Sequence, residues 1–351
     1  MTTISALYYL LGFAGAAFSA YLLTQHYIHY ALHKGVVDTP NDRSSHTTPT
    51  PRGGGVSIVI VSLALFAVAL MAPNLLATQL TPPNLIALLL GGFIVAAIGF
   101  LDDLNPLSSK IRFSVHFIAS LAALSLIEPL PTLPLPGADM TLDGIWLIPV
   151  ALGLTWLINL YNFMDGIDGI AATEALTVLA GAITIGIFSA SASEIEFPWE
   201  ILALLTAPLL GFLLLNWSPA KVFMGDGCSG FLGITLGLLA VIYAANTPVN
   251  LWCWIILLGV FITDACWTLA TRIVTKQKWH QPHRSHCYQI LSRKLQSHRQ
   301  VTSGAAAINL MWLTPLAVFA SRHPEYGALF TLLAFTPLML LCHRHQAGLH
   351  N

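Results

Sequence analysis

Long apolar runs and short polar breaks alternate along the whole chain. A helix that spans the hydrocarbon core of a bilayer needs about 20 mostly apolar residues. By that measure the pattern predicts eleven transmembrane helices, near residues 3–24, 54–72, 84–101, 112–128, 145–161, 170–190, 198–216, 229–246, 251–271, 303–320 and 326–342. We therefore expect an all-α, polytopic integral membrane protein in which residues 1–351 form a single transmembrane domain.

Composition supports a membrane protein. Charged residues make up 9% of the chain and hydrophobic residues 56%, with a mean hydropathy of +0.72, whereas a soluble domain carries about 25% charged residues. The net charge of -1 gives no reason to expect a nucleic-acid partner. The 5 cysteines form no CxxC pair and are predicted to be free thiols.

The basic residues predict an orientation. Of the 15 Lys and Arg residues, only Arg322 falls in an even-numbered gap between predicted helices. The positive-inside rule then makes the odd-numbered gaps cytoplasmic, with the N-terminus outside and the C-terminus inside. The Pro-rich segment PLPTLPLPG lies in an even-numbered gap and is predicted to be a short solvated connector.

Five aspartates stand at the ends of apolar runs, and all five fall on the predicted cytoplasmic side. They are Asp102, Asp103, Asp165, Asp168 and Asp226. Placing a carboxylate near hydrocarbon costs free energy, so several carboxylates together imply a bound group that stabilises their negative charge. A divalent cation with a phosphorylated substrate is the natural candidate.

Each group of acids has a functional interpretation and a structural alternative. Adjacent residues on a helix point about 100° apart, so Asp102 and Asp103, followed by Lys110, can line two sides of a cleft. The alternative is a helix end that reaches water. Asp226 lies between two glycines after Lys221, which leaves room for Mg²⁺ with its waters, although a tight turn would also suit these residues.

Asn159, Asn162, Asp165 and Asp168 recur every three residues. Their amides can hold a nucleobase, and their carboxylates can accept ribose hydroxyls or bind metal. The alternative is a hydrated loop of turn formers.

Three further features carry candidate binding groups. Arg52 and the glycines of PTPRGGG could cradle a phosphate. The loop over residues 272–302 carries His280, His283, Arg284, His286 and His298; we favour phosphate binding over zinc, and a basic face against anionic lipid stays open. Asp264, inside the ninth predicted span, is either functional or bonded to another helix.

Together these motifs resemble the polyprenyl-phosphate N-acetylhexosamine-1-phosphate transferase family, within the phospho-N-acetylmuramoyl-pentapeptide transferase superfamily. The matching elements are PTPRGGG, the DD pair with Lys110, NxxNxxDGxDG, KVFMGD and the histidine loop, in the family's order from about residue 38 to 290. The resemblance implies transfer of a sugar 1-phosphate from a UDP-N-acetylhexosamine to undecaprenyl phosphate, with release of UMP.

The resemblance also implies residue roles. Asp226 would bind Mg²⁺, with Mn²⁺ as a substitute, and Asp102 and Asp103 would lie at the phosphate centre, where one would deprotonate the lipid phosphate. Asn162, Asp165 and Asp168 would form the uridine and metal side, Asp165 as a further metal residue. Substrate contacts are also expected from Arg52, Lys110, Lys221, Asp264, His283, Arg284 and His286.

Two departures from the family pattern matter. Cys228 stands where the family usually has glycine, and the histidine loop is HRSHCYQ rather than the HxHH type. The second departure resembles the branch that initiates O-antigen or other surface glycans, and it argues against a muramoyl-pentapeptide substrate. We expect a bacterial inner-membrane enzyme with a cytoplasmic active site and a homodimer among its states. The rival class is an ion-coupled transporter or lipid flippase.

Overall fold

The structure is a computed structural model that describes residues 3–39, 49–76, 78–190, 197–278, 281 and 283–349. His280 lies outside the described residues. Most of the described chain is helical, so the predicted all-α class is confirmed. The helices are α1 (Thr3–Lys34), α2 (Val56–Met71), α3 (Pro73–Leu76), α4 (Pro82–Leu104), α5 (Ser109–Leu124), α6 (Leu147–Met164), α7 (Ile170–Ala190), α8 (Glu200–Asn216), α9 (Asp226–Asn246), α10 (Leu251–Leu257), α11 (Gly259–Val274), α12 (Cys287–Leu295), α13 (His298–Ile308), α14 (Thr314–Arg322) and α15 (Gly327–Arg344).

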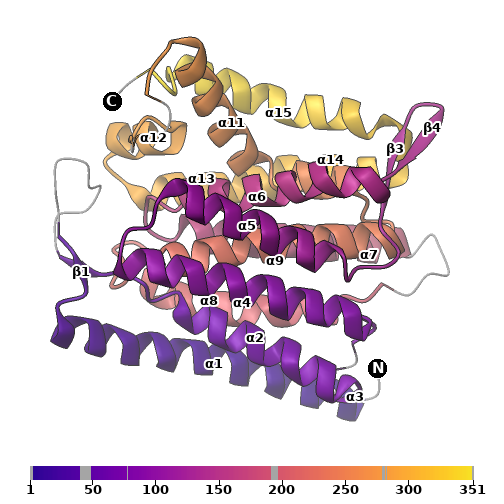
Figure 1. The fold of residues 1–351 in the computed structure, drawn as a ribbon, viewed down its shortest axis with the longest axis horizontal. Coiled ribbons are helices and arrows are strands. Elements are labelled where there is room, and N and C mark those ends of the chain that lie inside the picture. Colours follow the sequence, from indigo (N-terminus) through magenta and orange to yellow (C-terminus); the bar gives the residue numbers. More distant parts are fainter. Residues whose placement is uncertain are drawn as a thin grey trace.

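Helix α9 runs through the middle of the bundle, with α4 and α6 among its neighbours (Figure 1). Every residue from Gly227 to Tyr243 is buried, as expected for a helix that is apolar on all sides. A Cβ atom at Gly99 of α4 would lie 2.6 Å from the Cα atom of Gly227. Such close approach through small residues is typical of membrane helices, and it sets the end of α4 beside the start of α9.

The outer helices carry large apolar side chains that the protein leaves exposed. Leu10 and Phe18 of α1 and Leu332 and Leu340 of α15 are examples. In a bilayer these side chains would contact lipid, because the backbone polar groups of a helix are satisfied internally.

Among the described residues, six helical segments are long and apolar enough to cross a membrane. They are Pro82–Leu104, Gly144–Met164, Ile170–Ser189, Asp226–Asn246, His298–Arg322 and Pro324–Arg344. The pair α10 and α11 would make a seventh, and α2 and α8 are shorter apolar helices. Each of the eleven predicted segments contains helix, whereas the count of eleven spans and the orientation stay predictions.

Two predicted spans differ from the structure. The ninth is a broken helix, because α10 and α11 meet at an angle of 73°. The tenth begins earlier, at His298, and contains a π-helical segment, Asn309–Leu313. In that segment the Asn309 amide donates to Glu174 Oε2 of α7 at 2.6 Å. Hydropathy alone predicts neither feature, because both depend on contacts between helices.

Short strands lie at both ends of the bundle (Figure 1). Strand β1 (Val37–Asp38) pairs with β2 (Thr50–Pro51) at one end. At the other end β3 (Thr132–Leu135) pairs with β4 (Ala138–Thr141). The Pro-rich connector therefore contains a hairpin, which its prolines obscured in the sequence.

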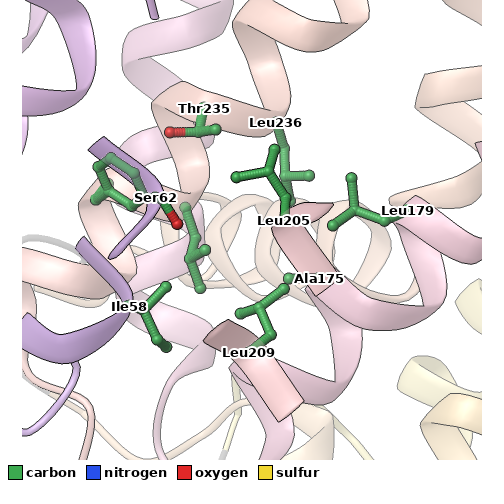
Figure 2. Close-up of a pocket in the computed structure, with 10 residues that line it drawn as sticks. Ile58, Ser62, Ala175, Leu179, Leu205, Leu209, Thr235 and Leu236 are labelled. Atoms are coloured by element: carbon green, nitrogen blue, oxygen red, sulfur yellow. The ribbon is translucent and has the colours of Figure 1, made fainter. Parts of the chain in front are cut away.

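A small apolar cavity of about 10 Å³ lies between α2, α7, α8 and α9 (Figure 2). Ile58, Leu179 and Leu205 line it, and Ser62 and Thr235 supply its side-chain oxygens. A cavity of this size holds about one water molecule, so it is part of the core packing and not a substrate site.

The contact between α4 and α9 predicts a stability effect. Replacing Gly99 with Ala should lower the free energy of unfolding by about 1–3 kcal/mol, because the new methyl group meets backbone atoms that cannot move aside. Gly153→Ala on α6 is the matched control, since a Cβ atom there meets nothing within 4 Å. Thermal unfolding in detergent measures both variants. Equal melting temperatures would show that the two helices can separate without cost.

Candidate active site

Two polar segments that are far apart in the sequence pair through their backbones. A β-bridge joins Arg52 to Phe223, and the amides of Gly53 and Gly54 donate to the Phe223 carbonyl oxygen at 3.1 and 3.0 Å. The pairing sets PTPRGGG against KVFMGD. This pairing places Arg52 beside Asp226.

Glycine is required at the crossing of these two segments. Gly225 has a φ of 88°, a conformation that side chains with a Cβ atom rarely adopt. A Cβ atom there would lie 2.7 Å from the Cα atom of Gly53 and 3.0 Å from Asp103 Oδ2. The glycine-rich motifs therefore let backbone approach backbone and carboxylate.

The centre of the site is an ion-pair junction of three residues from three separate segments. Arg52 Nη2 lies 2.6 Å from Asp226 Oδ1 and 3.1 Å from Asp103 Oδ1. The Gly227 amide, in the first turn of α9, donates to Asp103 Oδ2 at 3.3 Å. We call Asp103, Arg52 and Asp226 the acidic junction.

Asp102 points to a different side of α4, as the 100° rotation between neighbouring residues predicts. Its Oδ2 atom pairs with Arg112 Nη1 at 2.5 Å, and its Oδ1 atom accepts from the Leu107 amide at 2.6 Å. Arg112 Nη1 also lies 3.9 Å from Asp226 Oδ2. Asp102 therefore holds the turn after α4 and places a second guanidinium near Asp226.

Asp165 follows the last residue of α6 and lies deep among protein atoms while keeping some solvent contact. Burial raises the pKa of its carboxyl to about 7, and the negative charges of Asp226 and Asp103 add to this effect while Arg52 opposes it. The same charges place Asp165 within electrostatic reach of the acidic junction. Asn162, one turn earlier, donates to Ser229 Oγ of α9 at 3.2 Å.

Asp168 is bonded within the chain through both carboxylate oxygens. His298 Nδ1 lies 3.2 Å from Oδ1, and the Ala220 amide donates to Oδ2 at 3.2 Å. Burial alone would raise the pKa of Asp168, but the interactions with His298 and the hydrogen bonds from Ser218 and the Ala220 amide together lower it. Asp168 therefore joins the start of α13 to the turn before Lys221; its predicted substrate contact stays a prediction.

Asp264 of α11 organises the histidine loop, residues 283–289. Its Oδ1 atom accepts from the Cys287 amide and its Oδ2 atom from the Tyr288 amide, both at 2.9 Å. His286 Nδ1 lies 3.2 Å from Oδ1. The carboxylate thus lies at the N-terminus of α12, where it is favoured by unpaired amides. The sequence left open whether Asp264 bonds to another helix. The structure shows that it does, through the first two residues of α12.

The predicted loop residues lie together. The rings of His283 and His286 stack with centroids 5.0 Å apart, and His283 Nδ1 lies 3.0 Å from Ser285 Oγ. Burial lowers the pKa of His283 to about 4, and the neighbouring His286 and Arg272 add to this effect. The Arg284 carbonyl oxygen accepts from Arg293 Nη2 at 3.0 Å. The loop reaches α6 through Tyr288, whose hydroxyl donates to the Phe163 carbonyl oxygen at 2.9 Å.

The two predicted lysines are both exposed. Lys110 lies in the first turn of α5, and Lys221 is the first residue of the KVFMGD motif. Their substrate contacts stay predictions.

Three residues join the site without having been predicted for it. Arg112 had been counted only as a positive charge, His298 only as a loop histidine, and Tyr288 not at all. Each bonds to a partner across a turn or from another helix, and residue spacing could not reveal such a partner. The DD pair ten residues before Arg112 was the one available signal.

The acidic junction suits a divalent cation bound together with phosphate oxygens. In the described part of the chain, no group of three or more His, Cys, Asp and Glu side chains forms a ready-made metal site. Two carboxylates do meet, however, and Asp103 Oδ1 is buried without a hydrogen-bond donor apart from its ion pair with Arg52. Mg²⁺ uses one or two carboxylates and takes its other ligands from water and substrate phosphates.

Comparison with known proteins places this arrangement in a family. Residues 85–244 match the model of glycosyl transferase family 4. The chain is 31% identical over 274 residues to a probable undecaprenyl-phosphate N-acetylglucosaminyl 1-phosphate transferase of Bacillus subtilis, covering 77% of this chain and 73% of the relative.

Two other relatives are similar over shorter stretches. A decaprenyl-phosphate N-acetylglucosaminephosphotransferase of Mycolicibacterium smegmatis is 32% identical, over 59% of this chain and 53% of its own length. A phospho-N-acetylmuramoyl-pentapeptide-transferase of Thermotoga neapolitana is 30% identical, over 57% of this chain and 63% of its own length. The family match over residues 85–244 includes Asp103 and Asp226. The resemblance drawn from the motifs is confirmed: this chain belongs to glycosyl transferase family 4.

Proposed function

We propose that this protein transfers an N-acetylhexosamine 1-phosphate from a UDP-sugar to undecaprenyl phosphate and releases UMP. The observation that carries the proposal is the acidic junction at one end of an apolar bundle. Phosphoryl transfer needs positioning and charge neutralisation more than covalent chemistry. The junction would supply both by holding a divalent cation beside Arg52 and Arg112. The names of the relatives, which mention polyprenyl phosphates and hexosamine phosphates, support the same class.

In the proposed reaction, an oxygen of the lipid phosphate attacks the β-phosphorus of the donor. A P–O bond forms there, and the bond from that phosphorus to the bridging oxygen breaks, so the electron pair leaves with UMP. Arg52 and Arg112 present planar pairs of N–H donors that suit phosphate oxygens. Asp102 is held by Arg112 and the Leu107 amide, and Asp103 by Arg52 and the Gly227 amide. One of these two carboxylates would take a proton from the lipid phosphate.

Asp226 and Asp103 are the residues that would hold the metal ion, with Asp165 close by. Mg²⁺, or Mn²⁺ in its place, would supply positive charge to the diphosphate and to the leaving group. Asn162 and Asp165 border the junction from α6, which favours them for the uridine side of the donor. The histidine loop, held by Asp264, is the proposed partner of the donor phosphates.

We further propose that the sugar carries no peptide, as the HRSHCYQ loop suggests. The reaction would then be the first membrane step of O-antigen or another surface polysaccharide. We place the enzyme in a bacterial inner membrane with its active site facing the cytoplasm, because the basic residues gather in the gaps that contain the junction.

The direct test incubates purified protein with undecaprenyl phosphate, Mg²⁺ and a panel of UDP-N-acetylhexosamines, with UDP-muramoyl-pentapeptide as a further donor. We expect UMP release that needs both substrates and stops when the metal is chelated. Substrate movement across vesicles without UMP release would favour the transporter class instead. A phosphorylated aspartate trapped with UDP-sugar alone would replace direct attack by a covalent intermediate.

Asp226→Asn tests whether Asp226 binds the metal ion in a protein that still folds. The variant should lose at least about 100-fold in turnover, because the charge at the reaction centre is removed, and it should bind Mn²⁺ more weakly. Asp139→Asn, on the exposed hairpin at the other end of the bundle, is the control. Turnover and the Mn²⁺ electron paramagnetic resonance signal measure both effects. Near-normal turnover in folded Asp226→Asn protein would remove Asp226 from the site.

Arg52→Gln should impair catalysis and leave metal binding intact. We expect a loss on the order of 100-fold in kcat/KM, because the diphosphate loses a donor pair, whereas Mn²⁺ binding persists because both carboxylates remain. Arg322→Gln, at the end of α14, serves as the control for loss of one positive charge. If Arg52→Gln lost Mn²⁺ binding together with Asp226→Asn, Arg52 would be needed to build the carboxylate site and not to bind substrate.

A further inference from the structure

The chain turns back on itself after α15. We call residues 345–349 the C-terminal tail. Gln346 and Gly348 have φ angles of 53° and 86°, which reverse the backbone, and the Ala347 amide donates to the Cys342 carbonyl oxygen at 2.9 Å. This turn brings the tail beside α11 and α12 (Figure 1).

Gly348 of the tail bonds to both ends of the segment that carries the histidine loop. Its amide donates to the Ser285 carbonyl oxygen at 2.8 Å. Its carbonyl oxygen accepts from Gln277 Nε2, also at 2.8 Å. One tail residue therefore ties Gln277, which follows α11, to Ser285, the residue before His286.

Side-chain packing accompanies these bonds. Ala347 is 1% exposed, and it packs in one cluster with Cys287 and Cys342, each 3% exposed. A Cβ atom at Gly348 would lie 2.7 Å from Thr271 Cβ and 2.9 Å from the Thr268 carbonyl oxygen. The tail is thus in close contact with α11 and covers the first residue of α12.

The histidine loop is therefore held from two sides. On one side Asp264 accepts from the Cys287 and Tyr288 amides and from His286. On the other side Gly348 holds the Ser285 carbonyl oxygen. Asp264 fixes residues 286–288, and the tail fixes the residue before them. Arg272 Nη1 of α11 also donates to Ser285 Oγ, at 3.3 Å.

We propose that the C-terminal tail is a positioning element for the histidine loop, so that undocking the tail loosens His283 and His286 and weakens use of the donor. The docking is a property of the fold. Its effect on turnover rests on the proposed function, because that function gives the loop its role toward the donor phosphates.

Gly348→Val tests the proposal, and Gly137→Val is its matched control. Valine at Gly348 meets a positive φ and the backbone of α11, whereas Gly137 has a φ of 85° with nothing within 4 Å of an added Cβ atom. Both variants carry the same backbone strain. Only Gly348→Val should displace the tail.

Two measurements report the result. Maleimide labelling of Cys287, followed by peptide mass spectrometry, should be faster by about tenfold or more in Gly348→Val, because the strain shifts the docking equilibrium. The value of kcat/KM for the UDP-sugar should fall by a comparable factor, and Gly137→Val should match the wild type in both. Gln277→Ala removes the bond to Gly348 together with the bonds to Arg272 and Thr275, and it adds no backbone strain. It should change both quantities in the same direction by a smaller factor.

Unchanged Cys287 labelling in folded Gly348→Val and Gln277→Ala would overturn the docking. Faster labelling with wild-type kcat/KM would overturn the positioning role. If wild-type protein released no UMP, the proposed function would fail, and the labelling would still decide whether the tail covers the loop.

Discussion

The Arg52 guanidinium, placed between the carboxylates of Asp103 and Asp226, is the interaction on which the rest of the site depends. The three residues come from the segment before α2, the end of α4 and the start of α9. Two carboxylates this close repel unless a positive charge lies between them. Arg52 supplies that charge. A metal cation bound with phosphate oxygens would likewise place positive charge beside the two carboxylates.

The apolar bundle holds these charges at a fixed spacing. Glycines let α4 approach α9 and let the Arg52 segment cross Gly225, so close backbone contacts fix the segments from which the charged side chains extend. Backbone contacts also order the histidine loop, because the buried carboxylate of Asp264 binds backbone amides and thereby fixes residues 286–288. Positioned charge is what phosphoryl transfer requires from a protein.

Much of this could be predicted from the sequence, and the failures have physical reasons. The helices and the acids at their ends were predictable, because a carboxylate beside an apolar run stands out. The partnership of Arg52 with Asp226 was not, because 174 residues separate them. The bend between α10 and α11 and the π-helical segment at Asn309 were missed because hydropathy averages over residues, whereas both features depend on contacts with neighbouring helices. His298 was predictable only as a loop histidine, since its partner Asp168 lies 130 residues earlier.

We propose that the cation and the donor diphosphate meet at the acidic junction. The most direct measurement is the ³¹P hyperfine coupling to Mn²⁺ bound to the protein with UDP-sugar, recorded for the wild type and for Asp226→Asn. We expect a resolved ³¹P coupling in the wild type and its loss in the variant. A coupling that persists unchanged in Asp226→Asn would place the metal and diphosphate elsewhere and rule out the acidic junction as their binding site.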